Sequence, residues 1–297
     1  MITPYSNIIS VTTLSSLLLD TYTGAAAAYS LRRLSGSYTG SAIEVRRDSD
    51  NATQDIGFVN NELDTSTLST FCSGTDGFVT TWYDQSGNGY DATQTTASNQ
   101  PKIYDSSSGV IEENGKPSVE FDGSDDKLLA LNFTNAETMT IHPVFKQNTS
   151  GYKLLWSHNY GSNAQNTGRF IAPKVSANLE DWISGDLLFC GDGYVSIQDP
   201  RFIGNNSLSL LTQYLLSMYL GTSISNIYAN GNNLISRIST NQSLPIETSN
   251  MAIGGRSAGP AEYFDGIIQE FIIYNYDQSS NRSGIESNIN DFYSIYP

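Results

Sequence analysis

The sequence predicts an all-β sandwich, and three observations lead to this fold class. Short runs of β-branched and aromatic residues alternate with clusters of Gly, Asn, Asp and Ser along most of the 297 residues. The segment Ile267–Tyr274 is apolar enough for a central strand. Asn230-Gly231 directly follows the apolar run Ile227–Ala229, and because both residues readily adopt positive φ, this pair predicts a tight hairpin.

The elements are expected in one domain, because no internal repeat or low-complexity linker divides the chain. We expect the sandwich over residues 21–297, behind an N-terminal arm over residues 1–20. Helix formers over Leu14–Leu34, interrupted by Gly24, predict one helical stretch there that includes Ala25–Leu34. The segments predicted as strands are Ala42–Arg46, Phe78–Tyr83, Ser118–Phe121, Met139–Lys146, Lys153–Ser157, Leu187–Cys190, Leu215–Leu220, Asn226–Ala229, Asn250–Ile253 and Gly266–Tyr274.

Charge and cysteine usage exclude several function classes. The formal net charge of −15 should repel phosphate backbones and anionic membrane faces, so we expect neither nucleic acid nor a membrane as partner. The apolar run Leu14–Leu19 is too short to span a bilayer and has no basic flank, so we predict neither a signal peptide nor a membrane anchor. Cys72 and Cys190 lie far apart in the sequence and are predicted to be free, part-buried thiols.

Three segments resemble the signature of concanavalin A-like (laminin G-like) jelly rolls. They are Val119–Gly123, Ile253–Arg256 and Tyr263–Phe271, and they occur in the order typical of that family. The resemblance implies a jelly-roll β-sandwich and says little about its ligand.

A longer resemblance is to the catalytic domain of family 54 α-L-arabinofuranosidases, which is itself a sandwich of this kind. The most specific block is Tyr83–Gly87, with the sequence Tyr-Asp-Gln-Ser-Gly. The other matching blocks are Ala28–Arg33, Tyr38–Gly40, Val45–Arg47, Asp50–Ile56, Phe71-Cys72, Thr93-Gln94 and, more weakly, Tyr160-Gly161, Ala177–Glu180, Ile253–Gly255 and Phe264–Gly266.

The departures from that family concern its chemistry. Retaining glycosidases need two carboxyl groups about 5 to 5.5 Å apart. The resemblance implies that Glu180 is the counterpart of the nucleophile, whereas the acid/base aspartate would fall at Arg256. A guanidinium stays protonated and cannot cycle a proton at neutral pH. We therefore predict a non-catalytic protein, and the alternative is a retaining α-L-arabinofuranosidase-like hydrolase that uses Glu180.

The family's cysteines are also replaced. The resemblance places the partner of Cys72 at Gly77, and a vicinal pair that floors the sugar pocket at Trp156-Ser157. Trp156 would either stack on a sugar or lie in the core of the sandwich. The candidate glycan-binding residues are Trp156, Asp84, Tyr160, Glu180 and Arg256.

Loop carboxylates suggest the one inorganic ligand that we consider. Asp84, Asp122, Asp125, Asp126 and Asp265 could bind calcium or sugar hydroxyls, with Asp122, Asp125 and Asp265 as the weak calcium candidates. The alternative is that an aspartate before Gly or Ser simply forms a turn. No other cofactor is predicted. The two histidines, His142 and His158, have neither a serine elbow nor a zinc pattern beside them, and we expect His142 to be a buried imidazole.

The leading functional prediction comes from a third resemblance. Blocks such as Ala28–Arg32 and Trp82–Gly87, joined to a laminin G-like half, are similar to bacteriophage virion proteins. This implies a virion location and a structural or adhesive role, as a capsid decoration, head fibre or tail fibre component. The expected partners are other virion proteins, further copies of the chain and a cell-surface glycan. The arm residues that would dock onto a partner, unless the arm covers the sandwich's own core, are Ile8, Ile9, Leu14 and Leu17.

Overall fold

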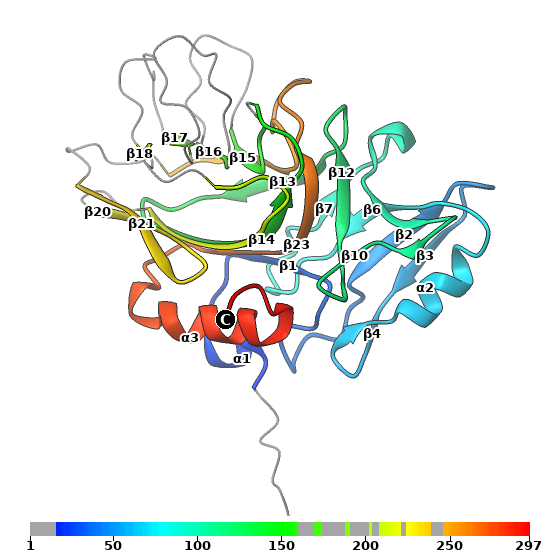
Figure 1. The fold of residues 1–297 in the computed structure, drawn as a ribbon, viewed down its shortest axis with the longest axis horizontal. Coiled ribbons are helices and arrows are strands. Elements are labelled where there is room, and N and C mark those ends of the chain that lie inside the picture. The colour runs from blue at the N-terminus through cyan, green and yellow to red at the C-terminus, as the bar shows by residue number, and fades with distance from the viewer. Residues whose placement is uncertain are drawn as a thin grey trace, which may run out of the picture.

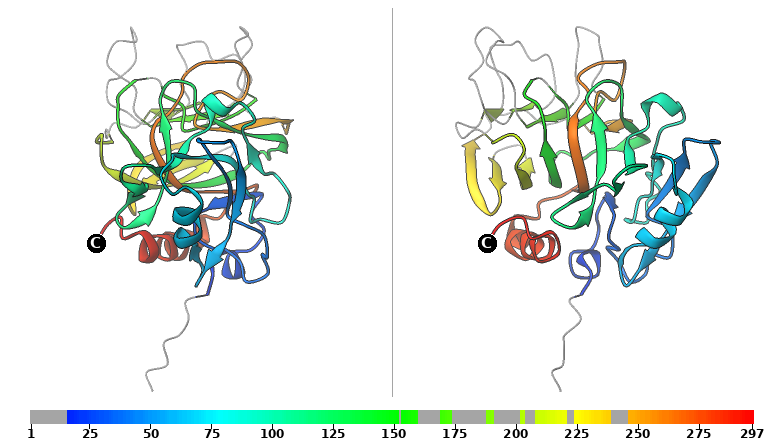
Figure 2. Two further views of the ribbon diagram at one scale, coloured as in Figure 1. Left: turned by 90° about the vertical axis from the view of Figure 1, so that its right-hand side faces the viewer. Right: turned by 45° about the vertical axis from the view of Figure 1, so that its right-hand side comes forward.

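The chain folds as a mostly antiparallel β-sandwich, with a smaller lobe of strands beside it (Figures 1 and 2). The structure is a computed structural model. It describes residues 16–151, 153–159, 169–173, 188–190, 202–203, 208–220, 224–238 and 246–297. Among these residues, no helix is both long and apolar enough to cross a bilayer.

The first sheet is built around β23 (Asp265–Tyr274), the strand that the sequence predicts as central. On one edge β23 pairs with β14, and on the other with β1 and β12, all antiparallel. β19, β20 and β21 extend the sheet beyond β14. The bounds are β1 Ala27–Ser30, β12 Val119–Asp122, β14 Met139–Gln147, β19 Gln213–Leu220, β20 Ile224–Ala229 and β21 Asn232–Ile238.

The hairpin between β20 and β21 is confirmed. Asn230 and Gly231 connect the strands with φ of 49° and 76°. These angles are tolerated because asparagine and glycine pay little for left-handed backbone.

The second sheet packs against the first, and β13 pairs with β7 and β22. β15 pairs with the other edge of β22, and β16, β17 and β18 follow in turn. Large aromatic side chains, all at most 1% exposed, fill the core: Phe121, Phe133, Phe145, Trp156, Phe264 and Phe271. The bounds are β7 Ala92–Thr93, β13 Leu128–Thr134, β15 Trp156–His158, β16 Arg169–Ala172, β17 Leu188–Cys190, β18 Phe202–Ile203 and β22 Thr248–Ile253.

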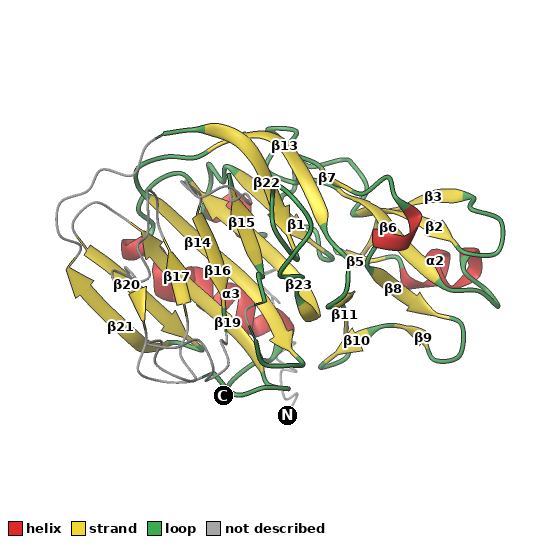
Figure 3. Cartoon of the chain, turned by 90° about the horizontal axis from the view of Figure 1, so that it is seen from above, coloured by secondary structure: helices red, strands yellow, loops and turns green. Residues whose placement is uncertain are grey.

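The smaller lobe continues the first sheet, because β8 pairs with β12 at Lys102 and Glu120. Figure 3 shows its strands β2, β3, β6 and β8 together with α2 at one end of the molecule. β2 lies between β3 and β6 there, and β6 also pairs with β8. The helix α2 (Thr65–Phe71) begins where the Asp64 carboxylate accepts the Thr67 N–H. The remaining bounds are β2 Ile43–Arg47, β3 Thr53–Ile56, β4 Phe58–Val59, β5 Glu62–Leu63, β6 Gly77–Trp82, η1 Ala97–Asn99, β8 Lys102–Asp105, β9 Gly109–Val110, β10 Glu112–Glu113 and β11 Lys116–Pro117.

The helix predicted at Ala25–Leu34 is wrong. Ala27–Ser30 instead forms β1, which pairs with Glu270–Ile273 of β23 and is buried along its whole length. Helix propensity is a weak preference, and here the ladder with β23 and burial on both faces outweigh it. Only Leu18–Thr21 is helical, as α1.

A C-terminal helix that the strand pattern did not predict covers the outer face of the first sheet (Figure 1). It is α3 (Arg282–Tyr293), preceded by the short η2 (Ser279–Asn281). Its buried Ile285 and Ile289 form a second core with β23, β14 and α1.

The described end of the arm belongs to the same core. Leu18 and Leu19 are buried in it, and Leu17, directly before α1, is half-buried. In this part the arm therefore covers the sandwich's own core. The other predicted docking residues, Ile8, Ile9 and Leu14, lie outside the described residues.

All predicted strand segments overlap observed strands. The largest offset is at Lys153–Ser157, where β15 begins only at Trp156 because Leu154 makes an isolated bridge to Tyr263.

Candidate functional site

The block that most resembles the arabinofuranosidase family is Tyr83–Gly87. Its Asp84 and Gln85 side chains hold backbone groups of neighbouring segments, and we call this arrangement the clamp. Asp84, only 4% exposed, accepts the backbone N–H groups of Ala28 at 2.8 Å, Ser86 at 2.9 Å and Tyr90 at 3.1 Å. Its Oδ2 also accepts the Ser86 hydroxyl at 2.7 Å. Burial raises the pKa of this carboxyl, whereas these donors lower it. The prediction that Asp84 contacts a glycan is wrong in this structure, because its oxygens are enclosed and hydrogen-bonded within the fold.

Gln85 completes the clamp. Its Nε2 donates to the carbonyls of Ser30 and Arg32 at 3.0 Å, and its Oε1 accepts the Leu34 N–H at 2.8 Å. Three backbone groups of residues 30–34 are thus satisfied by one side chain that is 3% exposed. The block at Tyr83–Gly87 and the block at Ala28–Arg33, which both resemble the same family, therefore hold each other in place.

The clamp continues into the first sheet through a buried ion pair. Arg32 Nε lies 2.8 Å from Glu270 Oε2, and the Ser30 hydroxyl donates to the same oxygen at 2.7 Å. Glu270 lies on β23 and is completely buried. A buried charge needs such partners, so this pair fixes β1 and the following turn against the central strand.

Arg256 follows β22, at the position to which the resemblance assigns the proton donor. Together with Glu262 and Lys127 it forms an edge of the sandwich that we call the rim. Its guanidinium forms a two-pronged ion pair with Glu262, with Nε 2.6 Å from Oε2. The two side chains are 16% and 17% exposed. Lys127 Nζ donates to the carbonyls of Arg256 and Gly259 at 3.2 and 3.0 Å, and burial lowers the pKa of this lysine. The charged side chains of the rim are therefore used within the protein: Arg256 pairs with Glu262, and Lys127 donates to backbone carbonyls.

Ser157 connects β15 to this rim. Its hydroxyl donates to the Gly255 carbonyl at 2.8 Å and accepts the Ser257 N–H at 2.7 Å. The two positions to which the resemblance assigns the sugar-pocket floor and the proton donor, 157 and 256, are therefore close together in the fold. Neither carries the family's side chain.

The Trp156 side chain does not face the rim. Its ring is fully buried and stacks on Phe271, with ring centroids 6.3 Å apart and an interplanar angle of 24°. The predicted stacking of Trp156 on a sugar is wrong in this structure, because the indole alternates with Ser157 along β15 and faces the core. Glu180 and Tyr160, the other candidate glycan residues, lie outside the described residues.

The structure confirms that Cys72 is a free, buried thiol. Burial raises the pKa of Cys72 to about 11. A Cβ atom at position 77 would lie 2.6 Å from Cys72 Sγ, so Gly77 occupies the place that the resemblance implies for a partner cysteine. The side chain of Cys190 lies outside what the structure describes.

The calcium candidates divide into two groups. One carboxylate oxygen each of Asp122, Asp125 and Asp126 lie within 4.8 Å of one another. Asp265 pairs with Asp122 across the β12–β23 ladder, but its carboxylate accepts the Thr149 hydroxyl at 2.5 Å and lies outside this cluster. Asp126, which the sequence also offers as a loop carboxylate, takes its place in the cluster beside Asp125.

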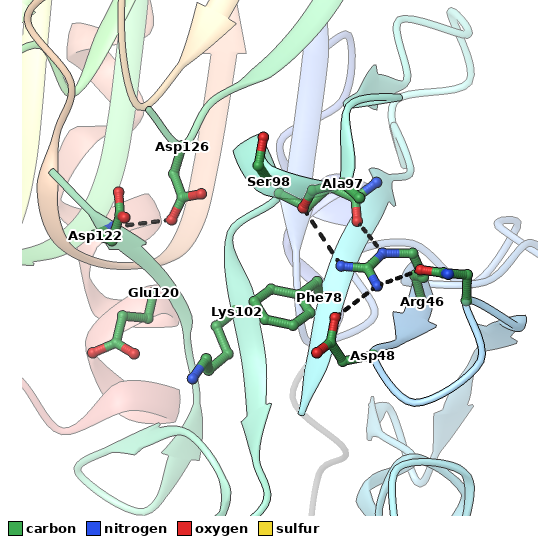
Figure 4. Close-up of a pocket in the computed structure, with 11 residues that line it drawn as sticks. Arg46, Asp48, Phe78, Ala97, Ser98, Lys102, Glu120, Asp122 and Asp126 are labelled. Atoms are coloured by element: carbon green, nitrogen blue, oxygen red, sulfur yellow. Dashed lines mark hydrogen bonds and ion pairs between the residues drawn. The ribbon is translucent and has the colours of Figure 1, made fainter. Parts of the chain in front are cut away.

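Of these carboxylates, Asp122 and Asp126 line a polar pocket of about 470 Å³ between the smaller lobe and the sandwich (Figure 4). Burial, followed by the charges of Asp122, Asp125 and Glu120, raises the pKa of Asp126 to about 7. The lining residues are Arg46, Asp48, Asn51, Phe78, Ala97, Ser98, Gln100, Lys102, Glu120, Asp122 and Asp126.

Comparison with known proteins agrees with the architecture. The family model "Alpha-L-arabinofuranosidase B, catalytic" matches residues 19–124, which is less than half of the chain. A comparison with curated proteins finds no match. Among solved structures, a GH54 α-L-arabinofuranosidase mutant soaked with 4-nitrophenyl α-L-arabinofuranoside superposes with a TM-score of 0.66 and 16% identity. An arabinofuranosidase complexed with arabinofuranosyl-α-1,2-xylobiose superposes with a TM-score of 0.65, also at 16% identity.

Both superpositions cover 92% of this chain and 64% of the other, so the chain spans just under two thirds of the proteins it resembles. The fold is accordingly an antiparallel β-sandwich. It resembles the catalytic domain of GH54 α-L-arabinofuranosidases.

Proposed function

We propose that this chain is a carbohydrate-directed domain of the arabinofuranosidase type, which recognises arabinofuranosyl groups of a glycan. The observation that carries the proposal is the agreement between the family match over residues 19–124 and a superposition that extends over 92% of the chain. The position of Ser157 against Gly255 and Ser257 supports it, because it keeps the two halves of the family's sugar pocket together.

Hydrolysis is the stronger form of this proposal. A retaining mechanism would use Glu180 as the nucleophile and a second carboxyl group as the acid/base. Position 256 holds a guanidinium instead, and Arg256 is paired with Glu262. We therefore expect glycan binding with slow turnover or none.

Activity on 4-nitrophenyl α-L-arabinofuranoside separates binding from hydrolysis. The purified chain and its Glu180→Gln variant are compared for release of nitrophenol, and both are titrated calorimetrically with an arabinofuranosylated xylo-oligosaccharide. Turnover that disappears in Glu180→Gln supports a hydrolase. Saturable binding without turnover supports recognition alone. The absence of both would overturn a carbohydrate-directed role.

The pairing of Arg256 with Glu262 favours a second candidate, a non-catalytic structural or adhesive protein. In this role the chain is a component of a bacteriophage particle, as a capsid decoration, head fibre or tail fibre, with other copies of itself and other virion proteins as partners. Sedimentation of the purified chain alone and with phage capsids tests this candidate. A monomer that binds no capsid but does bind the oligosaccharide would contradict it.

A further inference from the structure

The polar pocket between the smaller lobe and the sandwich lies where two neighbouring strands meet (Figure 4). Lys102 on β8 and Glu120 on β12 are cross-strand partners, and both residues line the pocket. Asp122 lies two residues after Glu120, so its side chain leaves β12 on the same face. The volume of about 470 Å³ lies within the range of small-molecule sites, roughly 300 to 1,000 Å³. The pocket therefore has the size and the polar groups of a binding site.

The wall formed by the smaller lobe carries a donor that is only partly used. Lys102 Nζ lies 2.7 Å from Asp76 Oδ2 and 3.4 Å from Asp105 Oδ2, its two acceptors among the described residues. An ammonium group has three N–H donors, so one is left for a ligand. Arg46, on the same wall, already donates to three side chains at 2.7 to 3.0 Å. Lys102 is therefore the group of this wall that can donate to a ligand.

The wall formed by the sandwich carries acceptors. The Glu120 carboxylate is half-buried, and it forms no hydrogen bond or ion pair with the part of the chain that the structure describes. Figure 4 shows it beside Lys102, yet none of the ion pairs among the described residues joins the two. Asp122 is exposed, and its Oδ1 accepts the Ser124 N–H at 2.8 Å. Accessible acceptors thus lie opposite an accessible donor.

The two walls together select the charge of a ligand. An anion would meet the carboxylates of Glu120, Asp122 and Asp126, which repel it. A compact cation would be bound by these carboxylates but would face Lys102, whose charge repels it and whose free N–H would stay without an acceptor. A hydroxyl group both donates and accepts hydrogen bonds, so a neutral ligand with several hydroxyls can serve both walls.

The lining also offers apolar surface for the carbon skeleton of such a ligand. The Phe78 ring belongs to the lining and lies beside Lys102, with Nζ 5.7 Å from the ring centroid. Small-molecule sites typically combine apolar surface with a few polar groups that fix the orientation of the ligand. We propose that this pocket binds a neutral saccharide unit, whose hydroxyls donate to Glu120 and Asp122 and accept from Lys102.

This site goes beyond the proposed function, which concerns Glu180 and the rim. None of the rim residues Arg256, Glu262 and Lys127 lines the pocket. Lys127 nevertheless connects the two regions, because its backbone N–H donates to the Asn99 carbonyl at 3.2 Å while its side chain donates to the Arg256 carbonyl. A saccharide in the pocket is therefore bound separately from the position that the resemblance assigns to the proton donor.

Calorimetric titration of the full chain with neutral monosaccharides tests the site. The probes are L-arabinose, D-xylose, D-glucose, D-galactose and D-mannose, with glucosamine and glucuronic acid as the cationic and anionic counterparts of glucose. We expect a neutral sugar to bind, with an affinity that changes less than about twofold on adding salt, because salt screens only charged ligands. Tighter binding of either charged sugar than of every neutral one would overturn the proposal. The absence of heat from all probes at tens of millimolar would overturn it as well.

Two variants locate the bound sugar and report its charge. Glu120→Ala and Lys102→Ala should each weaken binding about tenfold, because hydrogen bonds to charged groups are among the stronger ones. A cation would instead bind better to Lys102→Ala, and an anion to Glu120→Ala, and either result would contradict a neutral ligand. Glu120→Ala removes no hydrogen bond of the described fold, so it keeps the test valid if Lys102→Ala does not fold.

The matched control is Glu112→Ala, which removes an exposed carboxylate of β10 outside the pocket. It should change the affinity less than about twofold. A loss equal to that of Glu120→Ala would show an effect of net charge alone and would overturn the site. Binding that persists in Glu120→Ala but disappears in Glu180→Gln would overturn the pocket and leave the proposed function intact. Monosaccharide binding that depends on Glu120, without binding of the arabinofuranosylated oligosaccharide, would overturn only the proposed function.

Discussion

The clamp around Asp84 and the rim around Arg256 relate to the arabinofuranosidase pattern in opposite ways. In the clamp the family's residues are present, and their polar atoms are used to hold neighbouring backbone. At the rim the family's floor and proton donor are replaced, and the replacing groups are hydrogen-bonded or paired among themselves. The polar atoms of a block that resembles a family can therefore be used for folding, so the resemblance does not by itself indicate the family's chemistry.

The largest expected effect belongs to the clamp. Asp84→Ala leaves the N–H groups of Ala28, Ser86 and Tyr90 without their acceptor, and we expect it to lower the free energy of unfolding by roughly 5 kcal/mol. Urea unfolding measures it. The matched control is Asp55→Ala, whose exposed carboxylate accepts the Tyr83 hydroxyl and should cost less than about 1 kcal/mol. Equal costs for the two variants would contradict the structural role of the clamp.

The second expected effect concerns the face of the first sheet that α3 covers. The clamp is attached to the same sheet through the pair of Arg32 and Glu270. His142 is fully buried, its Nδ1 lies 3.1 Å from the Ser217 hydroxyl, and burial lowers its pKa to about 3. Because the unfolded chain gains a proton below about pH 6.5 and the folded chain does not, stability is complete above that pH and is lost as the pH falls toward 3.

At pH 4.5 this loss amounts to about 3 kcal/mol relative to pH 7.5. The measurement is urea unfolding at both pH values for the parent and for His142→Gln, which has no titrating ring. The variant should lose less stability between the two pH values than the parent does. The same loss in both proteins would show that His142 is protonated inside the fold or is not the group responsible.

The third expected effect concerns the distance between positions 72 and 77 in the smaller lobe, which the resemblance implies is short enough for a disulfide. Gly77→Cys places a thiol against Cys72 Sγ, and we expect the two to form a disulfide that adds about 2 kcal/mol under oxidising conditions. Thiol titration and unfolding with and without dithiothreitol measure it. With Cys190, the oxidised variant should show one titratable thiol after unfolding; three would contradict the proximity of positions 72 and 77.

The smallest effect belongs to the rim. In a double-mutant cycle of Arg256→Gln and Glu262→Gln, we expect a coupling energy of about 1 kcal/mol, because the pair lies near the surface and is partly screened by solvent. Adding salt should reduce it. A coupling above about 3 kcal/mol would make the rim as important to stability as the clamp, and the contrast between the two regions would no longer hold.

The strand pattern of the sequence was sufficient for the sandwich and its central strand, because alternation and β-branched composition are local properties that a pleated sheet requires. It failed at Ala25–Leu34, where helix formers lie in β1 because β23 offers a ladder and a buried surface. The approximate location of the acidic cluster was predictable from Asp122, Asp125 and Asp126, but Asp265 lies outside it because a carboxylate's direction depends on the backbone that carries it.

By itself the sequence determined the fold class and the hairpin at Asn230-Gly231, since each depends only on residue type and local spacing. The tertiary structure alone decided which polar side chains face outward. Trp156 and Asp84 looked suited to a sugar in the sequence, but burial made one a core ring and the other a backbone clamp. Burial depends on contacts between segments that are distant along the chain, and local sequence does not encode these contacts one residue at a time.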